Sequence, residues 1–241
     1  MIFHRSSLTK VKVIWAEAAS LIGKSHKSKD LPNQDACFVK NTSNGIVIAV
    51  ADGVGSDKDS EYASQAAVHA VYDIFMQYHP EQVDILGCLI CKRFDELMSD
   101  APSRVAGTTC IFCVLLNGTD MFLGQAGDGV CCGFIDNEPF ILKNKNSDFA
   151  NIVCPMFVGC SREAWSIMHF QGVSSTELML ATDGIADDIL PGMEAAFARH
   201  LVSELERLPQ QDRGAAVMEM LEHWETPNSF DDKTIALCRL G

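Results

Sequence analysis

The segment Ile46-Val-Ile-Ala-Val-Ala-Asp52-Gly53-Val-Gly55 joins an apolar, largely β-branched run to an aspartate and two glycines. The run predicts a strand over 46–51, and the aspartate lies where that strand ends. Glycine has no side chain, so a backbone carbonyl at this turn can come close to a ligand. Carboxylate and carbonyl oxygens are the ligands that hard cations prefer. The segment therefore predicts a strand end that presents oxygen atoms to an ion.

Three further aspartates stand beside predicted strands in the same way. They are Asp128 in a tight turn after 121–126, Asp183 after 177–181, and Asp231 before 234–239. A single aspartate of this kind is more often an ordinary turn residue, because Asp and Gly both favour turns. Four of them, each next to a predicted buried strand, favour a common site. Carboxylates without basic partners repel one another, so the set is best explained as a cage for Mg²⁺ or Mn²⁺.

The order of the other patterns indicates an α+β fold. Strands and helices come in separate blocks, and tight-turn signals such as Asn117-Gly118 predict a meander of four antiparallel strands between 107 and 142. Packed antiparallel sheets covered by helices are therefore expected, as a single domain over 1–241. The other elements predicted are strands over 12–16, 36–40, 46–51, 164–170, 177–181 and 234–239, and helices over 59–79, 82–98, 193–208 and 213–223.

The net charge of −13 excludes two classes of partner. A protein this acidic repels nucleic-acid phosphates and anionic lipid, so neither nucleic acid nor a membrane surface is an expected partner. The sequence shows neither an apolar run of about 18 residues, which a spanning helix needs, nor a secretory signal. The expected location is the cytoplasm.

The cysteines offer a competing hypothesis. Cys88 and Cys91 form one C-x2-C pair and Cys110 and Cys113 another, at a separation that occurs in four-cysteine zinc modules. The first pair, however, lies on an apolar helix face, and the second lies in a strand pattern where positions i and i+3 point to opposite sides. Buried thiols explain all four more simply, and the zinc module is kept as an alternative.

Taken in order, the motifs resemble a known family. They are Asn33-Gln34-Asp35, Val50-Ala-Asp-Gly-Val-Gly55, Gly107-Thr-Thr109, Ala126-Gly-Asp-Gly129, Ala181-Thr-Asp-Gly184 with Asp187, and Asp231-Asp-Lys-Thr234. Together they resemble the metal-dependent type 2C protein serine/threonine phosphatases, in particular their compact bacterial branch, over residues 23–240. The resemblance implies a four-layer sandwich, with two central antiparallel β-sheets flanked by helices and the metals in a channel at one end.

The resemblance also implies a catalytic centre with two Mn²⁺ or Mg²⁺ ions. Asp52 would bridge the ions, Gly53 would offer its carbonyl to the first, and Asp183 and Asp231 would bind the second. A hydroxide between the ions would attack phosphorus in line, without a covalent enzyme intermediate. The expected activity is hydrolysis of phosphoserine and phosphothreonine in proteins, as a signalling enzyme that opposes a serine/threonine kinase and acts as a monomer.

Supporting roles follow from the same resemblance. Asp35, which is also counted among the catalytic residues, would orient metal-bound waters together with Gln34 and Thr109. Asp128 and Asp187, with Asp183, would hold a third, weaker metal. Any flap over the site would come from residues 144–161.

Two positions depart from the family pattern. Many members carry an arginine before the first acidic motif to hold the phosphate, and here the candidates for that duty are Lys24, His26, Lys27 and Lys29. Gln34 stands where relatives often have glutamate. These departures motivate a further alternative, a catalytically silent module that keeps the fold and binds a phosphoprotein without hydrolysing it.

Overall fold

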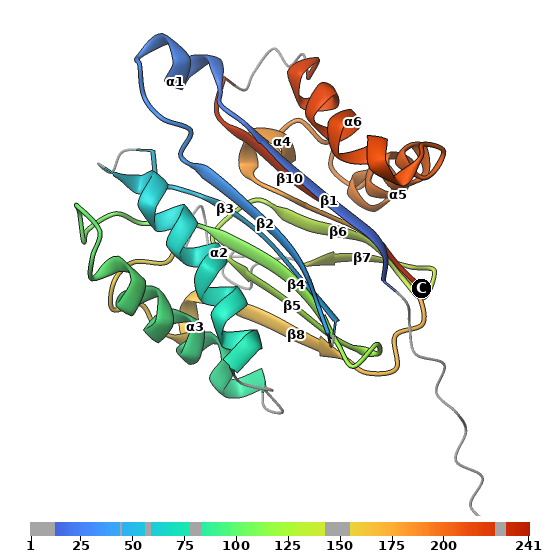
Figure 1. Cartoon of the computed structure of the whole chain (residues 1–241), viewed down its shortest axis with the longest axis horizontal. Coiled ribbons are helices and arrows are strands. Elements are labelled where there is room, and N and C mark those ends of the chain that lie inside the picture. The colour runs from blue at the N-terminus through green and yellow to red at the C-terminus, as the bar shows by residue number, and fades with distance from the viewer. Residues whose placement is uncertain (1–12, 44, 56–58, 78–82, 143–154, 225–229) are drawn as a thin grey trace, which may run out of the picture.

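Two antiparallel five-stranded sheets form the centre of the computed structural model, which describes residues 13–43, 45–55, 59–77, 83–142, 155–224 and 230–241 (Figure 1). We call the sheet with strand order β1-β10-β9-β6-β7 sheet 1, and the sheet with order β2-β3-β4-β5-β8 sheet 2. The strands are β1 (Val13–Leu21), β2 (Asp35–Thr42), β3 (Gly45–Asp52), β4 (Cys110–Leu116), β5 (Asp120–Ala126), β6 (Val130–Ile135), β7 (Glu138–Leu142), β8 (Ser166–Phe170), β9 (Thr176–Ala181) and β10 (Lys233–Leu240).

Helices cover the outer face of each sheet. Figure 1 shows α2 and α3 over sheet 2, with α5 and α6 over sheet 1. This arrangement confirms the predicted α+β fold with two central sheets flanked by helices. The α-helices described are α1 (Lys24–Ser28), α2 (Ser60–Gln77), α3 (Val83–Met98), α4 (Asp183–Ala186), α5 (Glu194–Glu206) and α6 (Gln210–Glu222).

Strand β3 shows why two layers can pack on sheet 2. Its side chains alternate between the faces, so Ile46, Ile48 and Val50 pack between the two sheets, whereas Val47 and Ala49 pack under the helices. All five are essentially inaccessible to solvent. A strand buried on both faces needs apolar residues at every position, which is the pattern that this segment has.

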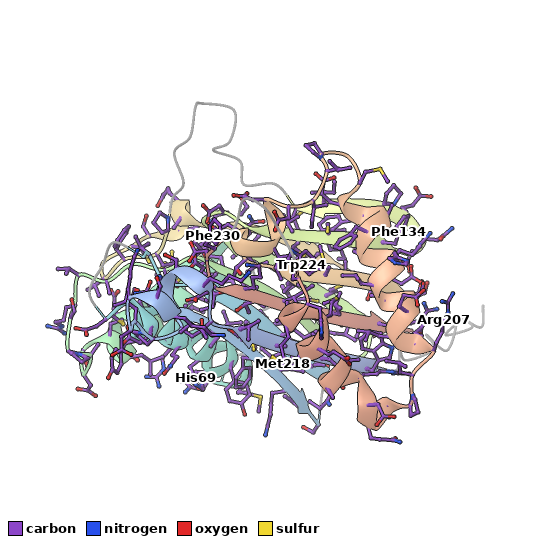
Figure 2. All side chains as sticks on the ribbon, turned by 90° about the horizontal axis from the view of Figure 1, so that it is seen from above. His69, Phe134, Arg207, Met218, Trp224 and Phe230 are labelled. Carbon is purple, nitrogen blue, oxygen red and sulfur yellow. The ribbon has the colours of Figure 1, made fainter. Side chains whose placement is uncertain are left out.

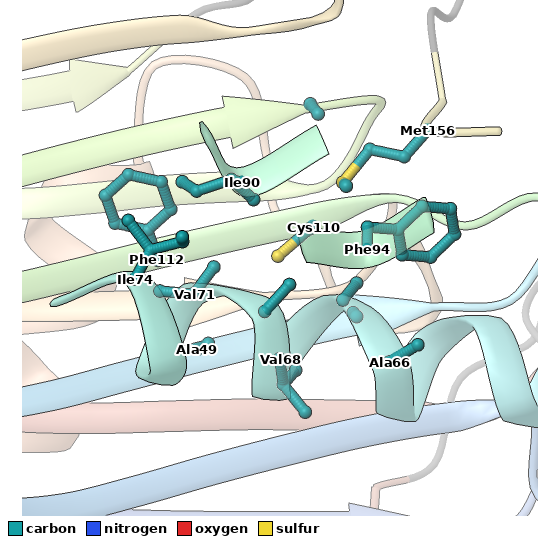
Figure 3. Packing of buried hydrophobic residues seen from close by; sticks show 14 of the residues in the cluster. Ala49, Ala66, Val68, Val71, Ile74, Ile90, Phe94, Cys110, Phe112 and Met156 are labelled. Atoms are coloured by element: carbon teal, nitrogen blue, oxygen red, sulfur yellow. The ribbon is translucent and has the colours of Figure 1, made fainter. Parts of the chain in front are cut away.

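The layer between sheet 2 and its helices is filled by large side chains. Figure 3 shows Val71 and Ile74 of α2 facing Phe112 of β4, with Ile90 and Phe94 of α3 beside them. Burial of each large apolar side chain contributes about 1.5–3 kcal/mol relative to exposure. This layer anchors the end of β3, where Asp52 lies.

The prediction of one continuous four-stranded meander is wrong at residues 127–129. All four strands exist, but β5 pairs with β4 and β8 in sheet 2, whereas β6 pairs with β7 and β9 in sheet 1. Gly127 and Gly129 both have φ of +88°, a left-handed conformation that glycine adopts without strain. The turn is therefore a crossover that carries Asp128 from one sheet to the other, and not a hairpin.

The four cysteines of the zinc hypothesis do not converge. Cys110 packs under the helices of sheet 2, whereas Cys113 lies between the two sheets. Cys88 is exposed on α3, and the buried Cys91 has its Sγ 2.7 Å from the Sγ of Cys160. Cys91 and Cys110 share the layer under the helices, but Cys113 lies on the other side of sheet 2 and Cys88 is exposed, so the four thiols cannot bind one ion and the zinc-module hypothesis is wrong for this fold.

None of the helices in the described ranges combines the length and the apolarity that crossing a bilayer requires.

Candidate metal centre

A cavity of about 300 Å³ opens where the ends of the two sheets meet. Asp52 reaches it from the end of β3, Asp183 from the start of α4 directly after β9, and Asp231 from the segment before β10. Asp128 reaches it from the crossover between the sheets. The structure therefore brings together four aspartates that stand far apart in the sequence, together with Gly53.

Three of these carboxylates lie within metal-binding distance of one another. Asp52, Asp128 and Asp183 each offer an oxygen, and these oxygens all lie within 4.8 Å of each other. Asp231 lines the same cavity, and its charge raises the pKa of both Asp52 and Asp183. The described residues that line the cavity include no lysine, arginine or histidine. The described lining of this cavity thus concentrates negative charge without a basic side chain among its members.

The pKa values of the aspartates show that the site disfavours ionised carboxylates when no cation is bound. Burial, with the charges of Asp128 and Asp231 acting in the same direction, raises the pKa of Asp183 to about 6. Burial also raises the pKa of Asp52, with the charges of Asp35 and Asp183 adding to the effect. A bound divalent cation would lower these pKa values, because its charge stabilises the ionised carboxylates. The donor set therefore fits Mg²⁺ or Mn²⁺.

Backbone hydrogen bonds fix Asp52 in place. Its N–H donates to the hydroxyl of Thr109 at 3.1 Å, and its carbonyl accepts from the N–H of Thr109 at 2.7 Å. The hydroxyl of Thr108 also donates to the Asp52 carbonyl at 2.8 Å. Thr109, predicted to orient water, thus lines the cavity and at the same time holds the backbone of the central aspartate.

Asp35 lies directly beside Asp52, because the two residues pair across β2 and β3. The side chain of Asp35 is buried, which raises its pKa to about 7. Its carboxylate accepts from the hydroxyl of Thr182 at 2.9 Å, and that hydroxyl in turn accepts from the N–H of Thr234 at 3.1 Å. Asp35 of sheet 2 is thereby joined to the ends of β9 and β10 in sheet 1.

Gln34 carries a buried polar atom without a partner. Its Oε1 makes no hydrogen bond to any described group, and it lies beside Gly55, which lines the cavity. A buried acceptor of this kind usually has water or an ion as its partner. The position fits the predicted role of Gln34 as a group that holds a water at the metal centre.

Asp232 was assigned no role from the sequence, although it organises this end of the molecule. Its buried carboxylate accepts from the N–H of Gly23 at 2.7 Å, from the N–H of Gln34 at 2.6 Å and from Nδ1 of His26 at 2.8 Å. The signal that could have found it is its place next to Asp231 in the last motif. Its partners are about 200 positions away, so their identity was not visible in the sequence.

The candidates for phosphate binding separate into two groups. His26 is buried, and its Nε2 lies 4.0 Å from Oδ1 of Asp231. His26 and Lys29 line a second cavity next to the metal centre, whereas Lys24 and Lys27 are exposed and are not among the residues that line either cavity. Asp187 also lines this second cavity, and its charge raises the pKa of Asp128 and Asp183.

The predicted flap falls mostly outside the described residues, since 143–154 are not among them. Its last part is described, and there Pro155 lines the metal cavity. Met156 pairs with Thr108 through two backbone hydrogen bonds of 2.7 and 2.9 Å. This pairing ties the segment to the strand region that holds Asp52.

Comparison with known families agrees with this geometry. The family model described as protein phosphatase 2C matches residues 22–224. This chain belongs to the protein phosphatase 2C family. It is therefore a metal-dependent protein phosphatase, of a family that acts on phosphoserine and phosphothreonine. None of the curated proteins matches the sequence.

Solved structures of phosphatases share the fold at low sequence identity. The catalytic domain of the serine/threonine phosphatase PstP, solved with two manganese ions, is 14% identical with a TM-score of 0.65, covering 95% of this chain and 98% of that one. Stp1 from Staphylococcus aureus is 16% identical with a TM-score of 0.65, covering 98% of both chains. MsPP from Mycobacterium smegmatis, solved with cacodylate, is 16% identical with a TM-score of 0.61, covering 94% and 97%.

Proposed function

We propose that this phosphatase hydrolyses phosphoserine and phosphothreonine in proteins by direct attack of water on phosphorus, with two Mn²⁺ or Mg²⁺ ions in the cavity at the sheet ends. Asp52, the Gly53 carbonyl, Asp183 and Asp231 would hold the two ions. Asp128 and Asp187, with Asp183, would hold a third. The observation that carries the proposal is the convergence of the carboxylates of Asp52, Asp128 and Asp183 within 4.8 Å.

Bound divalent cations would supply two things, a lowered pKa for a coordinated water and stabilisation of the charge on the phosphoryl oxygens. The chain's own residues would hold and orient that water. Asp35 is fixed next to Asp52 by the hydroxyl of Thr182, and Gln34 offers a buried amide oxygen with no other partner. Both are placed to accept a hydrogen bond from water.

The lining of the cavity favours direct attack over a covalent intermediate. Thr109 is the only residue with a hydroxyl among the described residues that line it, and no cysteine or histidine lies there. The hydroxyl oxygen of Thr109 accepts a hydrogen bond from the N–H of Asp52. Aspartate can also attack phosphorus, but the aspartates of this cavity would be engaged as metal ligands. Water is therefore the nucleophile that we propose.

We propose His26 as a residue that contacts the phosphate. A carboxylate only accepts hydrogen bonds, so Nδ1 of His26 carries the proton that bonds to Asp232. This bond orients Nε2 toward Asp231, at the rim shared by the two cavities. When both nitrogens are protonated, Nε2 can donate a hydrogen bond to a phosphoryl oxygen, which is part of the role that the arginine has in other family members.

The test is phosphatase activity with and without metal. The purified protein is assayed on an aryl phosphate and on a phosphothreonine peptide, in Mn²⁺ and in excess chelator. We expect activity that depends on Mn²⁺ and that falls at least about 100-fold in Asp52→Asn, because loss of a metal ligand costs more than loss of the residues around it. Asp100→Asn makes the same change at an exposed position and should leave activity unchanged. Hydrolysis that persists in chelator or in Asp52→Asn refutes the proposal.

The alternative of a silent binding module makes a different prediction. It is favoured by one observation, the neutral Gln34 beside a cluster that many relatives complete with a carboxylate. Such a module would bind a phosphothreonine peptide in the presence of Mn²⁺ without releasing phosphate. Measuring binding and phosphate release on the same peptide separates the two functions.

A further inference from the structure

An apolar cavity lies near the metal centre. Its volume is about 520 Å³, and most of its lining is apolar, from the turn after α4, from α5 and from Trp224 just after α6. Leu190 is 72% exposed and Met193 is 52% exposed, so large apolar side chains face solvent here. The lining includes Ile189, Leu190, Met193, Phe197, His200 and Trp224.

This apolar cavity adjoins the second cavity, which in turn adjoins the catalytic one. The second cavity, called the middle cavity below, has a volume of about 460 Å³ and is lined by Asp183 and Asp231 of the metal centre. Asp188 lines both the middle cavity and the apolar one. We call this row of three adjoining cavities the groove, which runs from the metal centre to the apolar cavity.

The walls of the groove are held by specific contacts. The indole Nε1 of Trp224 donates to a carboxylate oxygen of Asp188 at 3.1 Å. The rings of Phe197 and Trp224 pack edge to face with their centroids 5.9 Å apart. Phe230 lines the middle cavity and is 55% exposed. Figure 2 shows Trp224 and Phe230 on the same side of the molecule.

The charge in the middle cavity is of both signs. Asp187 and Asp188 line it in addition to the two aspartates of the metal centre, and so do His26 and Lys29. Bound cations would offset the charge of Asp183 and Asp231, so neither sign of charge dominates between the metal centre and the apolar cavity. Selection among substrate segments would therefore come from the apolar cavity.

Resting on the proposed function, we infer that this groove binds the part of the substrate protein that flanks the phosphorylated residue. The substrate class is a phosphoprotein whose segment carries a large apolar side chain near the phosphoserine or phosphothreonine, and this side chain enters the cavity of Leu190, Met193, Phe197 and Trp224. The middle cavity shares Asp188 with this apolar cavity and shares Asp183 and Asp231 with the catalytic one, so the apolar cavity lies within reach of a segment bound at the metal centre. Release of apolar surface from water would supply the affinity.

The experiment uses the Mn²⁺-loaded full chain and a set of phosphothreonine peptides. Each peptide carries one leucine or phenylalanine, moved from two to seven positions on either side of the phosphothreonine, with serine at the other flanking sites. We expect kcat/KM to rise about tenfold over a peptide without an apolar residue, at a restricted set of positions on one side.

Variants of the exposed groove residues test whether the gain in kcat/KM arises at the apolar cavity. Leu190→Ser and Met193→Ser should remove the gain by raising KM for the apolar peptide, while kinetics on the aryl phosphate and on the peptide without an apolar residue stay unchanged. Val105→Ser, at a residue that is 76% exposed and lines none of the three cavities, is the matched control.

The outcomes separate this inference from the proposed function. If the enzyme hydrolyses the aryl phosphate but treats all peptides alike, or if Leu190→Ser lowers activity on all substrates equally, the inference is overturned and the proposed function stands. If Leu190→Ser leaves every KM unchanged but converts a dimer into a monomer, a second copy occupies the groove and the inference is also overturned. If the enzyme hydrolyses nothing, the proposed function fails, and fluorescence anisotropy then tests whether the apolar peptide still binds more tightly than its control.

Discussion

Asp231 and Asp232 are neighbours in the sequence with different tasks. The side chain of Asp231 is 56% exposed and faces the metal cavity, whereas that of Asp232 is 1% exposed. The carboxylate of Asp232 joins Gly23, His26 and Gln34 to the start of β10. One peptide unit therefore separates a residue that would bind an ion from a residue that holds the surrounding backbone.

Substitution of these two residues should affect different properties, the stability of the fold for Asp232 and Mn²⁺ binding for Asp231. Asp232→Asn leaves at least one buried donor without its acceptor, so we expect the free energy of unfolding of the metal-free protein to fall by about 2–4 kcal/mol. Asp231→Asn should change that free energy by less than about 1 kcal/mol and should instead weaken Mn²⁺ binding. Urea denaturation in chelator and titration with Mn²⁺ measure the two properties. Equal stability of the two variants contradicts the assignment.

At the level of elements, the crossover between β5 and β6 sets the position of Asp128. Gly129 has φ of +88°, and a Cβ there would lie 2.6 Å from the carbonyl oxygen of Ala181. A side chain at this position would push the crossover away from the end of β9, where Asp183 follows. The geometry of the metal centre thus depends on a glycine that contributes no ligand.

Gly129→Ala should therefore lower the free energy of unfolding by more than the cost of placing an alanine at a positive φ. Gly192 has nearly the same φ, +85°, and has no atom near its Cβ position, so Gly192→Ala isolates the backbone cost of roughly 1 kcal/mol. For Gly129→Ala we expect a loss of about 3 kcal/mol and weaker Mn²⁺ binding. Thermal unfolding of both variants measures the difference, and equal shifts in Tm would argue against a packed crossover.

Which elements could be predicted from the sequence depends on whether their signals are local. The strands that end at Asp52 and precede Asp183 were predicted because an apolar run followed by Asp-Gly is visible within a short window. The crossover at 127–129 was taken for a hairpin because a turn has the same composition whether or not the next strand pairs with the previous one. The short helices α1 and α4 were not predicted, since four or five residues are too few to show a helical period.

The residues of the candidate site likewise divide into those with a local sequence signal and those without one. The four aspartates of the cavity were predicted because their motifs match a family in order, and the fold then brought them to one place. The contacts of Asp232 and the groove beyond Asp188 depend on side chains from distant segments, and no local pattern indicates them. His26 was one of several candidates until its burial and its bond to Asp232 distinguished it from Lys24 and Lys27.

For the whole molecule, the buried carboxylates predict that the metal-free protein becomes less stable as the pH rises. The pKa of Asp183 is raised from 3.8 to about 6 and that of Asp35 to about 7. A carboxyl with a raised pKa binds more protons in the folded state, so stability is fully present below pH 3.8 and is lost as the pH rises through 6 and 7. The Tm of the chelated protein should fall by about 5 °C between pH 5 and pH 7.

Mn²⁺ should reverse this trend. Binding requires ionised carboxylates, so the increase in Tm that Mn²⁺ produces should be larger at pH 8 than at pH 5.5. Differential scanning calorimetry at matched ionic strength, with and without Mn²⁺, measures both effects. A chelated protein whose Tm rises steadily from pH 5 to pH 8 would show that burial and mutual repulsion do not raise the pKa of these carboxyl groups in the metal-free fold.

The most direct test of the metal centre is the anomalous scattering of crystals soaked in Mn²⁺, with data collected on both sides of the manganese absorption edge. We predict two strong peaks in the cavity, both within coordination distance of Asp52, one of them also close to Asp183 and Asp231, and a weaker peak near Asp128. A map without peaks in this cavity, from crystals whose enzyme is active, would contradict the account.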